Sequence, residues 1–196
     1  MEKEINQSLL NGNGNVRYSG NNIYFFTEFN SESCIEFLVA FKSIEAIEIG
    51  EYNHIKSKEP NTNYIPTINI YINSYGGTVS DCMQMFDMVK SSLCKITTIV
   101  NGAAYSCGAI FSLVGDKRKM TKNSFMLHHQ LSSGVIGTYS NIIDKAHNAI
   151  EVMKRIKVII MENSKLDENS LDELLSRDLL LSPEECLKWG LIDEII

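Results

Sequence analysis

Apolar and polar positions alternate in blocks through the middle of the chain, and these blocks predict strands and helices in turn. Short apolar runs predict strands at 23–26, 67–72 and 96–100, and a further strand is expected at 124–131. Apolar residues from 79 to 93 recur at steps of three and four, which is typical of a helix with one buried face. Alternating strands and helices favour parallel pairing with right-handed crossovers, so we expect an α/β fold.

The pattern is weaker toward the N-terminus. Residues 1–20 are polar and rich in Asn and Gly, which predicts a flexible tail. An apolar segment at 35–41 indicates a helix whose N-cap is Ser31 or Ser33. Residues 48–66 are polar and contain Lys, Asn and Pro, so we expect them to form a surface loop.

Toward the C-terminus, an apolar stripe at 139–163 predicts the longest helix of the chain. This stripe could serve the core of the domain or a neighbouring subunit. Ser170 and Ser182 each stand three residues before a glutamate, the spacing of a capping box, and so predict two short helices. A final apolar segment at 191–196 predicts a terminal strand. Because no repeat or linker interrupts the sequence, residues 1–196 are expected to form a single domain.

Charge and cysteine content disfavour several functional classes. The 196 residues carry a net charge of −6 and no basic footprint, which disfavours a nucleic-acid partner. No apolar run reaches the length of a membrane span. The five cysteines are scattered without Cys-x-x-Cys spacing, which favours reduced thiols in the cytoplasm over disulfides or a zinc site. We expect neither a metal nor a cofactor.

The small residues at 101–109 organise the candidate chemistry. They are followed by an apolar helical run, so Ser106 is expected at a helix N-terminus, where unpaired amides favour a developing anion. The alternative is a serine that only caps the helix. Cys107 is a rival nucleophile, but one residue along a helix turns about 100° away, which favours a packed thiol. Gly77 follows a predicted strand and is either part of a tight turn or an amide offered to an oxyanion.

A nucleophilic serine needs a base, and the base needs an acid that orients it. His128 and His129 are adjacent on a predicted strand, so their side chains face opposite sides and at most one can serve Ser106. Asp178 precedes an apolar segment and is either this acid or the ion-pair partner of Arg177.

Five motifs in this order resemble the caseinolytic protease family, ClpP, over about residues 67 to 196. They are Tyr71-Ile-Asn-Ser-Tyr-Gly-Gly, Gly102-Ala-Ala-Tyr-Ser-Cys-Gly-Ala, Met126-Leu-His-His-Gln, Arg177-Asp-Leu-Leu-Leu-Ser and Trp189-Gly-Leu-Ile-Asp. The resemblance implies a ClpP/crotonase-like repeated β-β-α spiral with a protruding handle at about 132–163. It also implies a serine endopeptidase with these roles: nucleophile Ser106, general base His129, orienting acid Asp178, oxyanion amides of Gly77 and Cys107, and a contact between rings at Arg177.

Family members stack two seven-membered rings into a hollow barrel. The resemblance therefore implies a homo-oligomer of stacked heptameric rings that takes peptide and unfolded protein substrates. A Clp-type AAA+ unfoldase is an implied partner. The chain departs from the family pattern at Tyr75 and Leu131, where proline is usual, and at Ser176, where an acid is usual. These departures suit a viral or otherwise divergent member.

Three alternatives stay open at this stage. One is a viral capsid-maturation (prohead) protease of the same fold that acts without an ATPase. Another is a crotonase-like acyl-CoA enzyme, which shares the strand–turn–helix geometry. The third is an inactive ring subunit. Capture by an unfoldase, CoA binding and serine labelling separate these alternatives.

Overall fold

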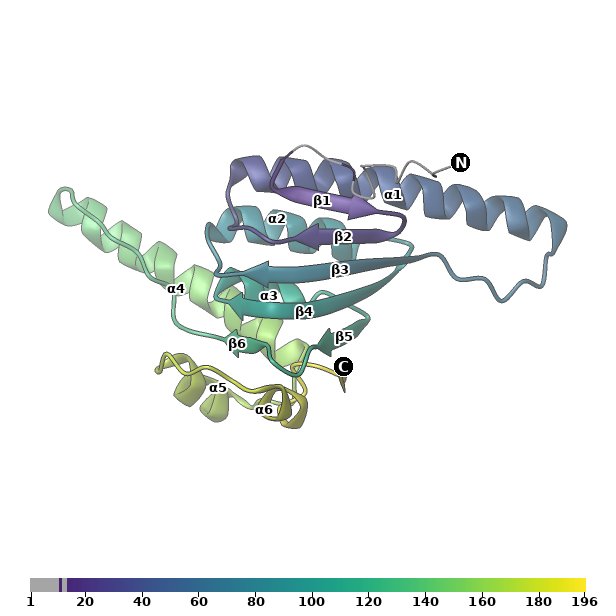
Figure 1. The fold of residues 1–196 in the computed structure, drawn as a ribbon. Coiled ribbons are helices and arrows are strands. Elements are labelled where there is room, and N and C mark those ends of the chain that lie inside the picture. Colours follow the sequence, from purple (N-terminus) through teal and green to yellow (C-terminus); the bar gives the residue numbers. More distant parts are fainter. Residues whose placement is uncertain (1–10, 12–13) are drawn as a thin grey trace, which may run out of the picture.

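The computed structural model describes residue 11 and residues 14–196, and residues 1–10, 12 and 13 of the predicted flexible tail lie outside this part. A mixed sheet runs in the order β1-β2-β3-β4-β5-β7, and β6 pairs with β4 (Figure 1). The strands are β1 (Val16–Ser19), β2 (Asn22–Phe25), β3 (Thr67–Ser74), β4 (Lys95–Tyr105), β5 (Lys117–Met120), β6 (Phe125–Leu127) and β7 (Glu194–Ile195). The helices are α1 (Ser31–Lys58), α2 (Val79–Lys90), α3 (Cys107–Ser112), α4 (Tyr139–Glu162), α5 (Glu168–Leu175) and α6 (Pro183–Lys188).

The predicted parallel pairing is confirmed. β2, β3, β4 and β5 pair in parallel, and so do β4 with β6 and β5 with β7, whereas β1 is antiparallel to β2. Along β3 the buried side chains alternate, because Ile68, Ile70 and Ile72 face the helices. The helices α1, α2 and α3 lie behind the sheet in the view of Figure 1. The protein therefore has the α/β architecture expected from the sequence.

Aromatic side chains fill the core between α1, α3 and the sheet. Phe25 and Phe29 have ring centroids 4.6 Å apart, and Phe111 lies 5.6 Å from Phe29 and 5.4 Å from Phe37. Edge-to-face and tilted pairs of this kind add to the stability gained by burying apolar area. Phe111 belongs to α3, the helix that follows Ser106, so the cluster packs that helix against the core.

Helix α4 projects away from the sheet (Figure 1). Its bounds agree with the predicted helix at 139–163, and among its residues only Ile156 and Ile160 are buried. The N-terminal half is exposed, with Ile142, Ile143 and Ile150 each at least 40% accessible. The apolar stripe thus serves the core only at its C-terminal end.

The structure corrects the prediction of a loop at 48–66. Helix α1 continues to Lys58, and only residues 59–66 form the connection to β3. This half of the helix extends past the sheet (Figure 1), and none of its residues after Ile44 is buried, so no apolar stripe marks it in the sequence. Lys56 and Lys58 lie in the last turn, where cations stabilise the C-terminal end of a helix.

Three other boundaries also differ. The predicted tail at 1–20 includes β1, which pairs with β2. The N-cap of α1 is Asn30, whose side chain accepts a hydrogen bond from the Ser33 amide at 2.9 Å, rather than Ser31 or Ser33. The N-cap of α5 is Asp167 rather than Ser170, whose amide donates to the Asp167 carboxylate.

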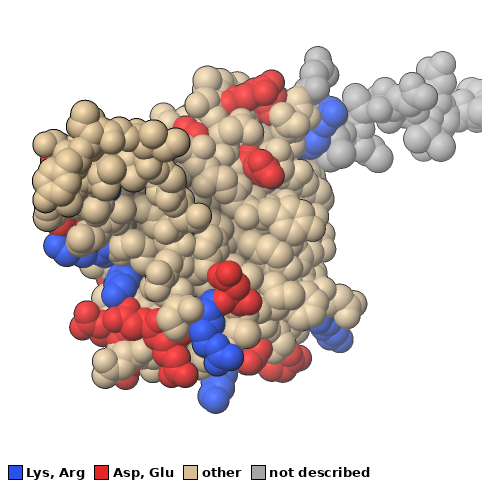
Figure 2. All heavy atoms as spheres, turned by 90° about the vertical axis from the view of Figure 1, so that its left-hand side faces the viewer, with Lys and Arg blue, Asp and Glu red and all other residues tan. Residues whose placement is uncertain are grey.

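The surface carries both signs of charge. Figure 2 shows acidic and basic side chains intermingled over the lower half of the face that it presents. In the part of the chain that the structure describes, no helix combines the length and apolarity needed to cross a membrane.

Candidate active site

Ser106 occupies the turn between β4 and α3 in a strained backbone conformation. Its φ of 56° and ψ of −120° make it the one residue other than glycine with positive φ among the described residues. It stands at the N-cap position of α3, but its side chain makes no capping hydrogen bond. Because such conformations are costly and gather at functional sites, this geometry favours a nucleophile over a capping serine.

The segment before Ser106 is more regular than the predicted turn at 101–109. Strand β4 continues through Tyr105, and a register shift in β3 between Ile72 and Ser74 accommodates the extra residues. The Ala103 amide donates to Asn73 Oδ1 at 3.0 Å. The turn is thereby reduced to Ser106 itself.

Two consecutive glycines approach Ser106 from the end of β3. Gly76 and Gly77 have φ of 107° and 138°, which side chains rarely allow. A Cβ on Gly76 would lie 2.7 Å from Ser106 Cβ, and one on Gly77 would lie 2.2 Å from the Phe29 carbonyl oxygen. Both positions therefore need glycine, because backbone or the nucleophile occupies the space of a side chain.

The backbone of Phe29 fixes the direction of the Gly77 amide. The Phe29 N–H donates to the Gly76 carbonyl at 2.8 Å, and the Thr78 N–H donates to the Phe29 carbonyl at 2.7 Å. In a trans peptide the N–H points opposite to the C=O, so the Gly77 N–H points away from Phe29.

Cys107 offers a second amide, because the first residues of a helix have no acceptor within the helix. Among the described residues, no carbonyl oxygen accepts a hydrogen bond from the Gly77 amide or the Cys107 amide, and both amides face the Cys107 sulfur closely enough to lower the pKa of its thiol. The two residues that carry the predicted oxyanion donors line the same pocket as Ser106.

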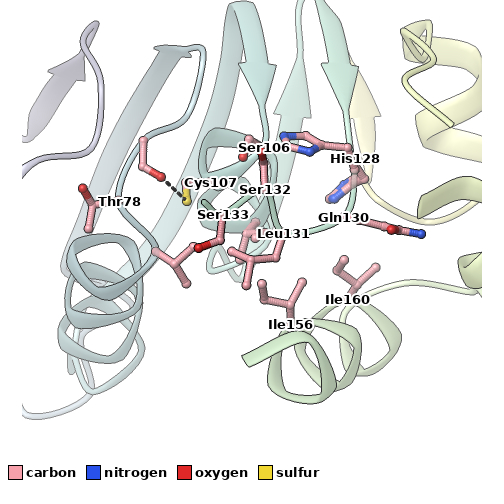
Figure 3. A pocket seen from close by; sticks show the side chains of 14 residues that line it. Thr78, Ser106, Cys107, His128, Gln130, Leu131, Ser132, Ser133, Ile156 and Ile160 are labelled. Atoms are coloured by element: carbon pink, nitrogen blue, oxygen red, sulfur yellow. Dashed lines mark hydrogen bonds between the residues drawn. The ribbon is translucent and has the colours of Figure 1, made fainter. Parts of the chain in front are cut away.

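This pocket has a volume of about 330 Å³. Its polar side contains Ser106, both adjacent histidines, Ser132 and Ser133 (Figure 3). Its apolar lining residues are Val79, Ile110, Leu131, Ile156 and Ile160. A polar centre beside an apolar wall suits a substrate with one reacting polar group and an apolar side chain.

The strand register associates Ser106 with His128. Ala104 pairs with Met126 and Tyr105 with Leu127, and the Ser106 N–H donates to the Leu127 carbonyl at 2.8 Å. The ladder ends there, and continuing its register by one step brings His128 beside Ser106, just beyond the ends of both strands. Figure 3 shows both side chains on the same side of the pocket.

His128 is almost fully buried, and its Nε2 atom has no hydrogen-bond partner among the described residues. Burial, assisted by the nearby His129, lowers the pKa of His128 from 6.5 to about 4. The imidazole is therefore neutral at physiological pH and able to accept a proton. His129 also lines the pocket but is half-buried and lies one residue beyond this register.

Asp178 lies outside the pocket in this structure. The segment after it pairs with β6, because Met126 and Leu181 exchange two backbone hydrogen bonds of 3.1 and 2.7 Å. Asp178 itself is exposed, and among the described residues it has neither a hydrogen bond nor an ion pair. The alternative pairing with Arg177 is also absent there, since that side chain is exposed and unpaired.

The Cys82 thiol of α2 and the Cys107 thiol of α3 shift each other's pKa. The Cys82 thiol lowers the pKa of Cys107, against the effect of burial. The pKa of Cys82 is raised, first by the Cys107 thiol and then by burial. In the described residues, no group of three or more His, Cys, Asp or Glu side chains is arranged to hold a metal ion.

The residues alone leave open which of the two adjacent histidines serves Ser106, and the family resemblance assigns the role to His129 through its His-Gln pair. The geometry of the pocket favours His128 instead. Part of the reason is readable in the burial pattern, because Met126 at the middle of β6 and His128 just beyond its end are two residues apart and both are buried.

The sequence profile of the Clp protease family matches residues 59–196, which is more than two thirds of the chain. The match starts just before β3 and includes Gly77, Ser106, both adjacent histidines and Asp178. It agrees with the α/β fold of the structure. The chain belongs to the Clp protease family, and is thereby a ClpP-like serine peptidase.

Proposed function

We propose that the protein is a serine endopeptidase in which Ser106 is the nucleophile and His128, rather than His129, is the general base. The observation that carries the proposal is one pocket, within the described residues, that holds a strained serine, two amides without a carbonyl acceptor and an imidazole nitrogen without a hydrogen-bond partner. These are the groups that acyl transfer needs within reach of one carbonyl carbon.

The reaction follows from these groups. His128 Nε2 takes the proton of the Ser106 hydroxyl as Oγ attacks the peptide carbonyl carbon. The Gly77 and Cys107 amides then donate to the oxyanion. The imidazolium gives its proton to the leaving nitrogen as the C–N bond breaks, and a water molecule activated by the same imidazole hydrolyses the acyl-enzyme.

Asp178 completes the triad in an assembled, active state. The antiparallel pairing of Met126 with Leu181 leads to residue 179 opposite residue 128, one position from the carboxylate. A shift of the exposed segment 176–180 would bring Asp178 to the remaining imidazole nitrogen. Its carboxylate would then hold the tautomer in which Nε2 is the acceptor.

Assembly into stacked rings is supported by the exposed apolar half of α4. Burying Ile142, Ile143 and Ile150 against another protomer would remove apolar surface from water. Arg177, next to Asp178 and exposed, is placed to transmit ring contact to the triad. Peptides and unfolded proteins are the proposed substrates, delivered by a Clp-type AAA+ unfoldase.

Covalent labelling tests the nucleophile. A fluorophosphonate probe should label the wild type and fail to label Ser106→Ala, while Ser132→Ala and Ser133→Ala keep their labelling. Those two serines line the same pocket and serve as matched controls. Equal labelling of wild type and Ser106→Ala would refute the proposed nucleophile.

A further inference from the structure

A thiol hydrogen bond joins the two segments that carry the oxyanion amides. Cys107 Sγ donates to the Gly77 carbonyl oxygen at 3.3 Å, and the dashed line at Cys107 in Figure 3 marks such a contact. Behind it, Cys82 Sγ donates to the carbonyl oxygen of Cys107 at 3.4 Å. Both thiols are buried, with exposures of 1% and 0%, so water does not compete for these acceptors.

Two consecutive peptide units, Gly76–Gly77 and Gly77–Thr78, are held by hydrogen bonds, and the Cys107 thiol supplies one of these bonds. The Gly76–Gly77 peptide is held through its carbonyl by the Phe29 amide, and the Gly77–Thr78 peptide is held through its N–H by the Phe29 carbonyl. The Gly77 carbonyl would otherwise have no donor among the described contacts. Because glycine has the largest conformational freedom, each added restraint matters most here.

We propose that the Cys107 side chain is a positioning residue that sets the spacing of the two oxyanion donors. Its own amide is one donor, and its thiol holds the peptide unit next to the other donor, at Gly77. One residue thus couples both halves of the site, and Cys82 secures the coupling residue from α2. This inference rests on the proposed serine peptidase function and adds a role to a side chain that touches no substrate.

The chemistry of the side chain makes the proposal specific. Serine at position 107 keeps a donor on a shorter arm, whereas alanine removes the donor and leaves the backbone amide in place. A thiol is a weak donor, so its removal should cost about threefold to tenfold in kcat. KM should change little, because substrate binding uses the apolar wall of the pocket.

The test compares Cys107→Ala, Cys107→Ser and Cys186→Ala. The last variant removes a fully buried thiol of α6 that does not line this pocket, and so controls for loss of packing. Peptide hydrolysis at a single fixed pH gives kcat and KM for each protein. Hydrogen exchange over residues 27–30 and 74–79 measures how firmly the hydrogen bonds hold the Gly77 segment, and it does not depend on activity.

We expect a lower kcat for Cys107→Ala, recovery of most of it in Cys107→Ser, and faster exchange at Phe29 and Thr78 only in the alanine variant. Equal kcat and exchange in all three variants and the wild type would overturn the proposal, as would equal losses in Cys107→Ala and Cys186→Ala. If the wild type has no peptidase activity, the proposed function fails, and the exchange result still decides whether the thiol holds the Gly77 segment.

Discussion

The amide nitrogen of Ser106 lies 2.8 Å from the carbonyl oxygen of Leu127. This hydrogen bond joins the candidate nucleophile to the last residue of β6, directly before the two histidines. Because successive side chains of an extended segment point in opposite directions, only one of the two histidines can face Ser106. The backbone pairing favours His128 over His129 as the proposed base.

Replacing the two histidines one at a time should separate their roles. His128→Ala should lower kcat/KM for a peptide substrate by about 100-fold or more, because it removes the proposed base. His129→Ala should keep activity within about tenfold of the wild type, since that side chain lies outside the register with Ser106. Peptide hydrolysis and fluorophosphonate labelling rates provide the measurement. The opposite order of losses would return the role of base to His129.

The burial of His128 should make the stability of the protein depend on pH. Its pKa is about 4 in the folded chain and 6.5 in the reference state, so the unfolded chain binds the proton first as pH falls. The free energy of unfolding is then fully maintained above pH 6.5 and is lost progressively toward pH 4. Between pH 7 and pH 5 the loss should be about 2 kcal/mol.

Urea unfolding of the wild type and His128→Gln at both pH values measures this contribution. The wild type should lose more stability than the variant over this interval, because glutamine does not titrate. Parallel pH profiles for the two proteins would show that the imidazole is not buried in its neutral form.

Gly50 tests whether α1 continues past the predicted loop boundary. It lies inside the helix, its φ is not positive, and a Cβ there would meet nothing within 4 Å. Gly50→Ala should therefore raise the free energy of unfolding by about 0.5–1 kcal/mol through helix propensity. Gly20→Ala, at a positive φ with equal space around it, should destabilise instead. No gain in Gly50→Ala would favour an unstructured segment at this position.

Sequence patterns predicted the parts of the fold that combine periodicity with burial. Strand β3, helix α2 and helix α4 were located because their apolar residues recur at steps that only one type of element uses. The second half of α1 was missed because it extends beyond the sheet, and no core selects its apolar positions. In the candidate site, the sequence indicated the types of residue involved, but periodicity and burial carry no information on the distances between their side chains.

Asp178 was a different kind of problem for sequence reasoning. Its distance from the proposed base depends on where the C-terminal segment packs against β6. That packing is a contact between residues far apart in the sequence, Met126 and Leu181. The sequence indicated only a residue type, a carboxylate, that could orient the base. It carried no information on whether the carboxylate reaches the imidazole in a single protomer, where the structure leaves it exposed.

Gly77→Ala should damage the oxyanion site more than any change at an unconstrained glycine. The new Cβ would lie 2.2 Å from the Phe29 carbonyl oxygen. The hydrogen bonds between Phe29 and the residues on either side of Gly77, which orient the Gly77 amide, could then not form. Loss of one oxyanion donor costs on the order of 100-fold in kcat. Gly134→Ala, with open space around it, is the matched control and should keep wild-type kcat. Equal kcat in both variants would remove the Gly77 amide from the mechanism.

Asp178→Asn should show whether assembly completes the triad. In the assembled protein we expect a loss of about 100-fold or more in kcat/KM, because asparagine cannot stabilise the imidazolium. A carboxylate that joins His128 raises its pKa from about 4, so the acid limb of the kcat/KM profile in the assembled wild type should lie well above pH 4. Activity increases with pH through this limb, because the base must be neutral to accept the serine proton.

Disrupting the rings, for example with Ile142→Asp and Ile143→Asp on α4, should lower activity and make the protomer insensitive to Asp178→Asn. Sensitivity to Asp178→Asn that is the same in rings and in isolated protomers would show that the acid joins the triad without assembly.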